Sequence, residues 1–308
     1  MEESLININK QLNFKIRESG NYLICGMGGS HLSADILKMV TSSNIQIYSD
    51  YGLPKIEDNT LIILSSFSGN TEEILDNAEH LRHKKEKNNI IVITSGGKLL
   101  EIAKELNWKY YLLPTPEEVG FNLQPRYAMF YSLKILSYII DTDIYCELET
   151  LSWNINSQYI SVSKKDGLET AKKIGNKIPI IYSSNYLSPL AYNLKIKFNE
   201  NSKIPAFTNV FPELNHNEIN GFNPGDNFFF IFLTCDKDND RIKKRISITK
   251  NLLVERKFLM TELDINNLSD IVYTLYDFDW ITYYIALEKN ISPDEIKIID
   301  QLKEELKK

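Results

Sequence analysis

Short apolar runs alternate with longer amphipathic stretches along the whole chain. In the first half, the runs at 61–64 and 90–93 are apolar at every position and are bounded by turn residues. Continuous apolar runs of this length are typical of strands that are buried on both faces. The pattern therefore predicts parallel sheets whose strands are connected by crossover helices.

The same alternation runs through both halves of the chain. The first half predicts strands at 22–25, 45–48, 61–64, 90–93 and 110–113, and helices at 32–40, 71–83, 98–106 and 126–140. The second half predicts strands at 178–182 and 228–233, and helices at 157–173, 187–198, 238–253, 268–288 and 293–306. The stretch 141–150 between them is polar and broken, so we expect two flavodoxin-like three-layer α/β/α domains, 1–148 and 149–308, each with a parallel sheet.

Length and charge narrow the class of protein. A chain of 308 residues is long enough to bury two cores. Lys+Arg 35 against Asp+Glu 41 gives a net charge of −6, which disfavours charge-driven binding to nucleic acid. Small anions remain possible ligands, because backbone N–H groups at a helix start bind them locally.

Cysteine usage and hydropathy point to a cytoplasmic protein without a membrane segment. Cys25, Cys146 and Cys235 are far apart and form no CxxC pair, so we expect neither disulfides nor a zinc site. The start of the chain lacks the basic region and apolar run of a signal peptide. No run of 18 apolar residues is present to cross a membrane.

A glycine-rich loop follows the first predicted strand. Residues 25–30 read CGMGGS and lead directly into a helix, where glycines let a ligand approach the backbone and the helix start offers free N–H groups. One alternative is a dinucleotide site with Asp50 as the ribose ligand, but His31 stands where that motif needs a third glycine. The other is a tight turn without a ligand.

A hydroxyl-rich loop follows the third predicted strand. Residues 65–73 read SSFSGNTEE and place Ser66, Ser68 and Thr71 where the next helix begins. Hydroxyl donors and backbone N–H groups at a helix start form a phosphate site that requires no lysine. The alternative is an ordinary helix cap. Because both loops follow parallel strands, we expect them at the same edge of the sheet.

These segments together resemble the bifunctional phosphoglucose/phosphomannose isomerase family. The motifs GMGGS and SFSGNTEE are followed by TSGGK at 94–98, Pro125-Arg126, NENSKIPA at 199–206, PELNHNEI at 212–219 and IDQLK at 299–303. They occur in the family's order and span nearly the whole chain. The resemblance implies two sugar-isomerase (SIS) domains, no cofactor, and a homodimer that acts on a sugar phosphate.

The resemblance also implies roles for individual residues. The residues expected to bind substrate are Gly28, Gly29, Ser30, Ser66, Ser68 and Thr71. The residues expected to act in the chemistry are Arg126, Glu200, His216 and Lys303. Glu200 would move a proton between C1 and C2 of the sugar, and Arg126 would stabilise the enediolate. His216 would open the sugar ring from the neighbouring subunit, and Lys303 would assist at the ring oxygen or the phosphate.

The chain departs from the family pattern beside the glycine-rich loop. His31 and Ala34 stand where the family commonly has glycine, and Phe67 replaces a tyrosine. His31 would lie at the entrance of the sugar pocket, which bears on substrate preference. His216 lies in a polar loop, and we expect Glu218 to orient its imidazole. The histidines show no metal-ligand spacing, so no metal is expected.

The sequence leaves two other functions open. A regulator that binds a sugar phosphate without catalysis would keep Ser66, Ser68 and Thr71, but it would not need Glu200 and His216 together. An isomerase of a five- or seven-carbon sugar phosphate is disfavoured by the two-domain length and by the His216 motif.

Overall fold

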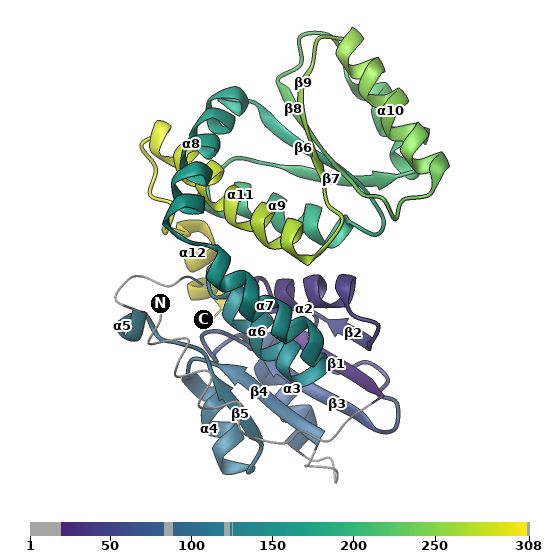
Figure 1. Ribbon diagram of the computed structural model, residues 1–308. Coiled ribbons are helices and arrows are strands. Elements are labelled where there is room, and N and C mark those ends of the chain that lie inside the picture. Colours follow the sequence, from purple (N-terminus) through teal and green to yellow (C-terminus); the bar gives the residue numbers. More distant parts are fainter. Residues whose placement is uncertain (1–19, 83–88, 120–123, 125, 307–308) are drawn as a thin grey trace. The chain divides into compact units, whose positions relative to one another are not determined.

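The computed structural model describes residues 20–82, 89–119, 124 and 126–306, and Pro125 lies outside them. The chain forms two compact units, Met1–Thr150 and Leu151–Lys308, each with its own sheet and core (Figure 1). Below, they are called the first and the second unit.

The first unit contains a five-stranded sheet in the order β2-β1-β3-β4-β5, in which every neighbouring pair is parallel. Its strands are β1 (Asn21–Gly26), β2 (Asn44–Tyr48), β3 (Thr60–Ser65), β4 (Ile90–Thr94) and β5 (Lys109–Leu112). This is the flavodoxin-like strand order, so the fold predicted for this half is confirmed.

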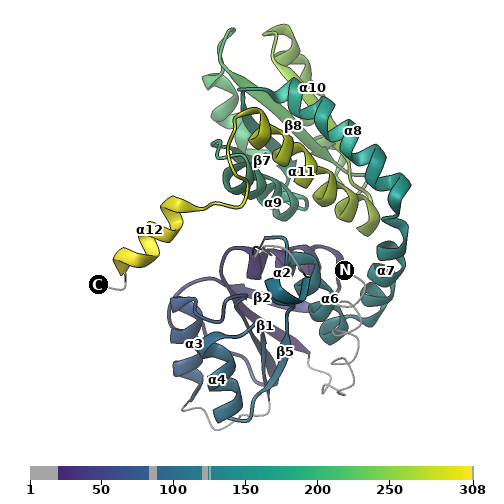
Figure 2. The same cartoon turned by 90° about the vertical axis from the view of Figure 1, so that its left-hand side faces the viewer.

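Helices cover both faces of the first sheet (Figure 2). They are α2 (Gly29–Val40), α3 (Glu72–Arg82), α4 (Gly97–Glu105) and α6 (Met129–Ile140), whereas the short helix α5 (Pro116–Val119) buries no residue. Side chains alternate across the sheet, so Leu64 and Val92 pack with Ile74 of α3 and Leu99 of α4. Helices α2 and α6 pack against each other on the opposite face.

The stretch 141–150, predicted to be a broken boundary, is helical. Helix α7 (Thr142–Asn154) begins there, and Asp141 acts as its cap because its Oδ1 accepts from the N–H of Ile144 at 3.3 Å. The other carboxylate oxygen of Asp141 accepts from the Thr41 hydroxyl at 2.7 Å. The polar residues that indicated a break are therefore a helix start, which uses the same residue types.

The second unit contains a four-stranded parallel sheet in the order β7-β6-β8-β9. Its strands are β6 (Ile178–Ser184), β7 (Phe207–Phe211), β8 (Phe228–Thr234) and β9 (Leu259–Asp264). The sequence predicted the central strands β6 and β8 and missed both edge strands. Edge strands are only partly buried, so β7 and β9 carry polar residues and show no continuous apolar run.

The second sheet is also covered on both faces. The helices of the second unit are α8 (Ser157–Ile174), α9 (Ser188–Asn201), η2 (Glu213–His216), η3 (Glu218–Gly221), α10 (Asp240–Glu255), α11 (Leu268–Glu288) and α12 (Lys297–Leu306). Ile246 and Leu253 of α10 pack on Ile180 and Phe230 of the sheet. The opposite face is covered by α8, α9 and α11, so the three-layer prediction is confirmed for this half.

Helix α12 begins later than predicted. The sequence placed its start at Pro293, whereas the helix begins at Lys297. The carbonyl of Pro293 accepts instead from Nζ of Lys203 at 2.9 Å. Pro293 is thus part of the connection that leaves α11, and proline fits such a connection as well as it fits a helix start.

Candidate active site

The glycine loop (residues 25–30) brings α2 close to the end of β1. A Cβ on Gly26 would lie 3.2 Å from the backbone nitrogen of His31, so a side chain there would crowd the first turn of the helix. Gly28 has φ +50 and open space around its Cα. The loop therefore combines a close backbone approach with an exposed turn, as a ligand-facing loop requires.

The serine loop (residues 65–71) is held together by its own hydroxyl groups. The Ser66 and Thr71 hydroxyls share a hydrogen bond of 2.8 Å, and the N–H of Gly69 donates to Ser66 Oγ at 3.1 Å. Ser66 is buried, Thr71 is half-buried and Ser68 is exposed. Ser66 therefore shapes the loop, while Ser68 and Thr71 lie nearer its surface.

A third loop, after β4, supports the serine loop. Ser95 donates to the carbonyl of Phe67 through its N–H at 2.9 Å and through its hydroxyl at 2.6 Å. Asn70 Oδ1 accepts from the N–H of Lys98 at 3.2 Å. A Cβ on Gly69 would lie 1.8 Å from the carbonyl oxygen of Gly96, so only glycine fits between these two loops.

The glycine and serine loops lie side by side, as the sequence predicted. The N–H of Phe67 donates to Ser30 Oγ at 3.2 Å, which joins the end of β3 to the start of α2. Strands β1, β3 and β4 are neighbours in the sheet, so their three following loops meet at its carboxyl edge. The sequence suggested Asn70 only as an alternative helix cap and gave no role to Ser95, although the TSGGK motif includes it.

This edge of the first sheet is suited to an anion. Among the described residues, the backbone N–H groups of Ser68 and Thr71 have no hydrogen-bond acceptor. Both precede α3, whose N-terminus carries a partial positive charge. Hydroxyl and N–H donors at this position match a phosphate group.

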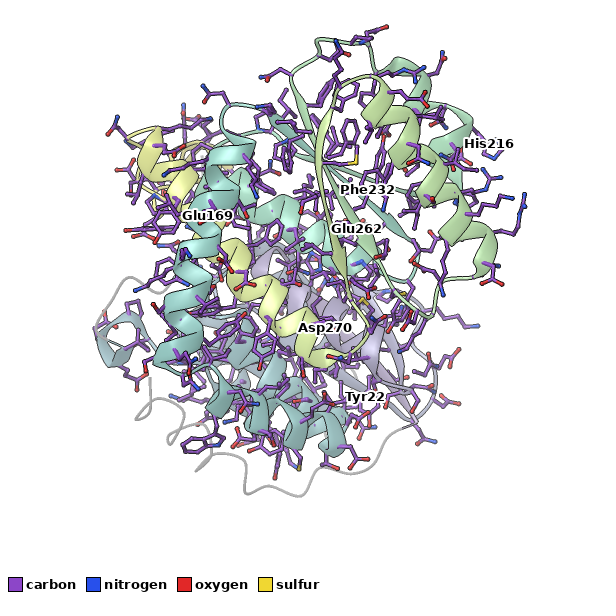
Figure 3. The ribbon with its side chains drawn as sticks, turned by 45° about the horizontal axis from the view of Figure 1, so that its top comes forward. Tyr22, Glu169, His216, Phe232, Glu262 and Asp270 are labelled. Carbon is purple, nitrogen blue, oxygen red and sulfur yellow. The ribbon has the colours of Figure 1, made fainter. Side chains whose placement is uncertain are left out.

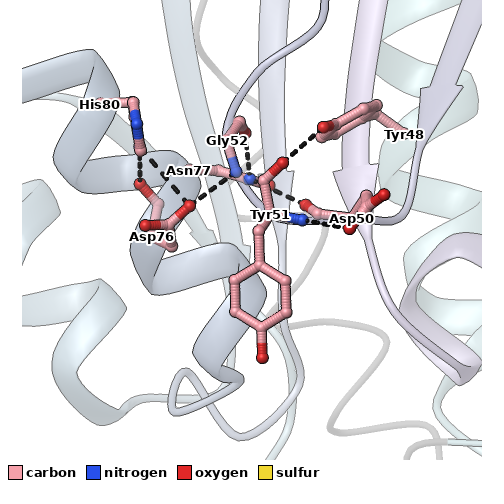
Figure 4. A network of polar contacts seen from close by, with 7 residues as sticks. All are labelled: Tyr48, Asp50, Tyr51, Gly52, Asp76, Asn77 and His80. Carbon is pink, nitrogen blue, oxygen red and sulfur yellow. Dashed lines mark hydrogen bonds and ion pairs between the residues drawn. The ribbon is translucent and has the colours of Figure 1, made fainter.

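The loop after β2 is occupied by a polar network (Figure 4). Asp50 Oδ1 accepts from the N–H of Tyr51 at 2.8 Å, and Asp76 of α3 accepts from the N–H of Gly52 at 2.6 Å. Asn77 donates to the carbonyl of Asp50 at 3.1 Å. Asp50, considered above as a ribose ligand, thus stabilises a turn, and the network joins α3 to the loop after β2.

His31 and Arg126 are the other residues singled out in the first unit. His31 Nδ1 lies 2.8 Å from Asp35 Oδ2, one turn further along α2, and its side chain is 14% exposed. Arg126 precedes α6, is 5% exposed, and places its guanidinium 4.8 Å from the centroid of the Tyr127 ring. A buried guanidinium keeps its charge, so it can stabilise a developing negative charge nearby.

Glu200 lies in the last turn of α9, which is fixed firmly to α11. Lys197, one turn earlier, is buried and forms an ion pair with the half-buried Asp279. Asn201, the next residue, donates to the Thr282 hydroxyl at 2.9 Å. Glu200 itself is half-buried, so its carboxylate is carried by a rigid helix end.

His216 is exposed and ends η2, just after β7 (Figure 3). The prediction that Glu218 orients its imidazole was wrong. Glu218 instead accepts from the buried Tyr182 hydroxyl at 2.7 Å and from the Asn209 side-chain amide. Burial, together with the bond to Glu218, raises the pKa of Tyr182.

Glu200 and His216 lie at opposite ends of the strands of the second sheet. Helix α9 follows β6 and must return to the start of β7, because the two strands are parallel. Glu200 at the end of α9 is therefore near the amino edge, whereas His216 follows the carboxyl end of β7. The five residues of β7 alone span roughly 13 Å.

Lys303 lies on α12, which has no buried residue. One side of this helix is apolar, and Ile298, Leu302 and Leu306 are 84%, 58% and 63% exposed. The structure thus places Lys303 on an exposed helix.

Three further observations concern the described part of the chain. No group of three His, Cys, Asp or Glu side chains converges as metal ligands do. None of its helices combines the length and the hydropathy that a membrane crossing requires. Cys25 and Cys235 are buried free thiols, as predicted, and burial raises the pKa of Cys25 to about 12.

Comparison with known proteins identifies the family. A bifunctional phosphoglucose/phosphomannose isomerase from Aquifex aeolicus is 35% identical over 300 residues, which cover 93% of this chain and 90% of that protein. The chain belongs to the bifunctional phosphoglucose/phosphomannose isomerase family. Residues 163–306 also match the family model of the bacterial phospho-glucose isomerase C-terminal SIS domain. The resemblance stated from the motifs is confirmed.

Two other similar proteins have different names from the family. A D-glucosamine-6-phosphate 4-epimerase from Sulfolobus acidocaldarius is 29% identical over 292 residues, which cover 91% of this chain and 87% of that protein. The crystal structure of a glucose-6-phosphate isomerase from Chlamydia trachomatis matches with a TM-score of 0.72 at 14% identity, covering 99% of this chain and 72% of that one. This last likeness concerns the fold.

Proposed function

We propose that this protein interconverts glucose 6-phosphate and mannose 6-phosphate with fructose 6-phosphate. Membership of the isomerase family supports the reaction type. The observation that carries the proposal is the set of three hydrogen-bonded loops at the carboxyl edge of the first sheet, which offers donors for a phosphate. A cytoplasmic location remains a prediction.

The proposed chemistry moves one proton from C2 to C1 and one from the C2 hydroxyl to the C1 oxygen, and it needs no cofactor or metal. Glu200 removes the proton from C2 of the open-chain aldose, and electrons shift to give an enediolate with its charge on the C1 oxygen. Arg126 stabilises that charge. The C2 hydroxyl proton passes to the C1 oxygen, which moves the negative charge to the C2 oxygen. The carboxylic acid of Glu200 then returns its proton to C1, and the C2 oxygen becomes the carbonyl of the ketose, so atoms and charges balance.

The remaining residues bind and open the sugar. Ser68 and Thr71 hold the phosphate, and the buried Ser66 keeps Thr71 in place. Gly28, Gly29 and Ser30 approach the reactive end of the sugar.

His216 opens the ring in the site of a partner subunit. This assignment is supported by the separation of Glu200 and His216 across the second sheet. Lys303 assists at the ring oxygen or the phosphate.

A coupled assay tests this function directly. The purified protein should form fructose 6-phosphate from glucose 6-phosphate and from mannose 6-phosphate, and a chelator should leave both rates unchanged. Glucosamine 6-phosphate should be left unaltered at C4, because the proposed base acts at C1 and C2. Turnover of glucosamine 6-phosphate alone would instead indicate the activity named for the Sulfolobus relative. Binding of the sugar phosphates without turnover would indicate a regulator.

A further inference from the structure

A cavity of about 290 Å³ lies in the second unit, beside the segment that carries His216. Asn215 and Ile219 line it from that segment. Helix α10 contributes the other lining residues, which are Arg241, Lys244, Arg245, Ile248, Thr249 and Leu252. They recur at every third or fourth position, so they form one continuous side of the helix. Figure 3 shows His216 beside this helix, on the outside of the unit.

The cavity has a local excess of positive charge. Arg241, Lys244 and Arg245 line it, and none of its lining residues is acidic. Within the described part of the chain, none of these three cations forms an ion pair, whereas Lys250 on the same helix pairs with Glu262. Since the whole chain carries a net charge of −6, this cluster is a local feature and does not reflect the composition.

One of the cations is held in position by the segment that carries His216. Nη1 of Arg245 donates to Asn215 Oδ1 at 3.3 Å, and Asn215 Nδ2 donates to the Thr249 hydroxyl at 2.9 Å. A guanidinium has five N–H donors, so this bond leaves Arg245 others for a ligand. Arg245 thus links the cavity to the residue before His216.

We propose that this cavity binds a small phosphorylated anion. The three cations would contact its phosphate or diphosphate group, for which arginine is well suited. An apolar part of the ligand would lie on Ile248 and Leu252, which are 49% and 38% exposed. A ligand on Arg245 would act through Asn215 on the position of His216. The binding rests on the cavity, and only its consequence for activity rests on the proposed function.

The test uses inorganic pyrophosphate and the full chain. Ser68→Ala/Thr71→Ala serves as the background, so that binding at the serine loop is reduced. In this background pyrophosphate should bind at one site per chain, and adding Arg241→Gln/Arg245→Gln should weaken it roughly tenfold to a hundredfold. Lys243→Gln is the matched control, because Lys243 is on α10 but does not line the cavity. It should leave the affinity unchanged.

Several outcomes would overturn the proposal. The first is that pyrophosphate does not bind in the serine-loop background. The second is that Arg241→Gln/Arg245→Gln leaves its affinity unchanged. The third is that Lys243→Gln weakens binding as much as Arg241→Gln/Arg245→Gln does, which would indicate diffuse attraction by the helix. If Ser68→Ala/Thr71→Ala binds phosphate as tightly as the wild type does, the proposed function fails, while the comparison of the cavity variants remains valid.

The NMR signals of the histidine imidazoles locate the bound anion. The chain has only 4 histidines, so the His216 signal is assigned from its absence in His216→Ala. Pyrophosphate should shift that signal in the serine-loop background, and Arg241→Gln/Arg245→Gln should abolish the shift. Binding without a shift of the His216 signal would place the anion elsewhere and contradict the proposal.

Discussion

Glu200 and His216 lie at opposite ends of the strands of one parallel sheet, with the length of β7 between them. A single copy of the second unit therefore does not bring them to one substrate. Because two-fold dimers exchange equivalent surfaces, a site with both residues is built naturally from two chains. This relationship leads to the first prediction.

Two inactive variants should restore activity to each other. Glu200→Gln and His216→Ala are mixed, dissociated and reassembled. In a mixed dimer one site receives both defects and the other receives neither, so roughly a quarter of wild-type activity should return with random pairing. A verified mixed dimer without activity would show that both residues serve the site of their own chain.

The second prediction concerns the proton acceptor. Glu200→Gln keeps the shape of the side chain and removes its basicity, so turnover should fall by a factor on the order of 10²–10⁴. In heavy water the wild type should incorporate deuterium at C2 of glucose 6-phosphate, and the variant should not. Glu169→Gln, on the exposed side of α8, is the control. Unchanged exchange in Glu200→Gln would exclude this residue from the chemistry.

The third prediction concerns the phosphate donors. Ser68→Ala and Thr71→Ala should each weaken binding of hexose 6-phosphates by about 1–3 kcal/mol, as expected when a charged group loses a hydrogen bond. The affinity is measured by competition with inorganic phosphate. Ser157→Ala, an exposed serine at the start of α8, should have no effect. If both loop variants bind hexose 6-phosphates normally, the serine loop is only a helix cap.

The fourth prediction concerns the contact between two loops. Gly69 has φ +64, and its Cβ position is occupied by the carbonyl of Gly96, so Gly69→Ala meets both strain and a clash. We expect a loss of more than about 1–3 kcal/mol in the free energy of unfolding. Gly28→Ala has a similar φ of +50 but open space, so it should cost less stability. Urea unfolding of both variants checks the order, and equal losses would contradict it.

The fifth prediction concerns pH. Burial raises the pKa of Tyr182, Tyr111 and Tyr145, the last two to about 12, whereas an unfolded tyrosine titrates near 10. The folded state keeps these protons after the unfolded state has lost them. Stability is therefore complete below about pH 10 and falls as the pH rises above it, by up to about 1.4 kcal/mol per pH unit for each tyrosine.

Tyr182→Phe should reduce this loss above pH 10. At neutral pH the same variant should lose about 1.5–3 kcal/mol, because Glu218 loses a donor. Tyr110→Phe, at an exposed position, is the control for both measurements. Unfolding free energies at pH 8 and above pH 10 give the comparison. An unchanged slope in Tyr182→Phe would show that its proton is not retained by folding.

The sequence by itself determined the central strands and the loops that follow them. Runs such as 61–64 are apolar at every position because both faces of a central strand are buried, and this property is local. The serine loop could be placed at the sheet edge because parallel strands put their carboxyl ends together. The motif order was enough to indicate the family.

Only the tertiary structure decided which residues meet through space. Edge strands β7 and β9 have no continuous apolar pattern, because each has only one neighbouring strand. Glu218 is close to His216 in sequence but bonds to Tyr182, which lies 36 positions away. The separation of Glu200 from His216 follows from the direction of β7, a strand that the sequence did not reveal. These contacts depend on the pairing and packing of distant segments, which local patterns of residues do not encode.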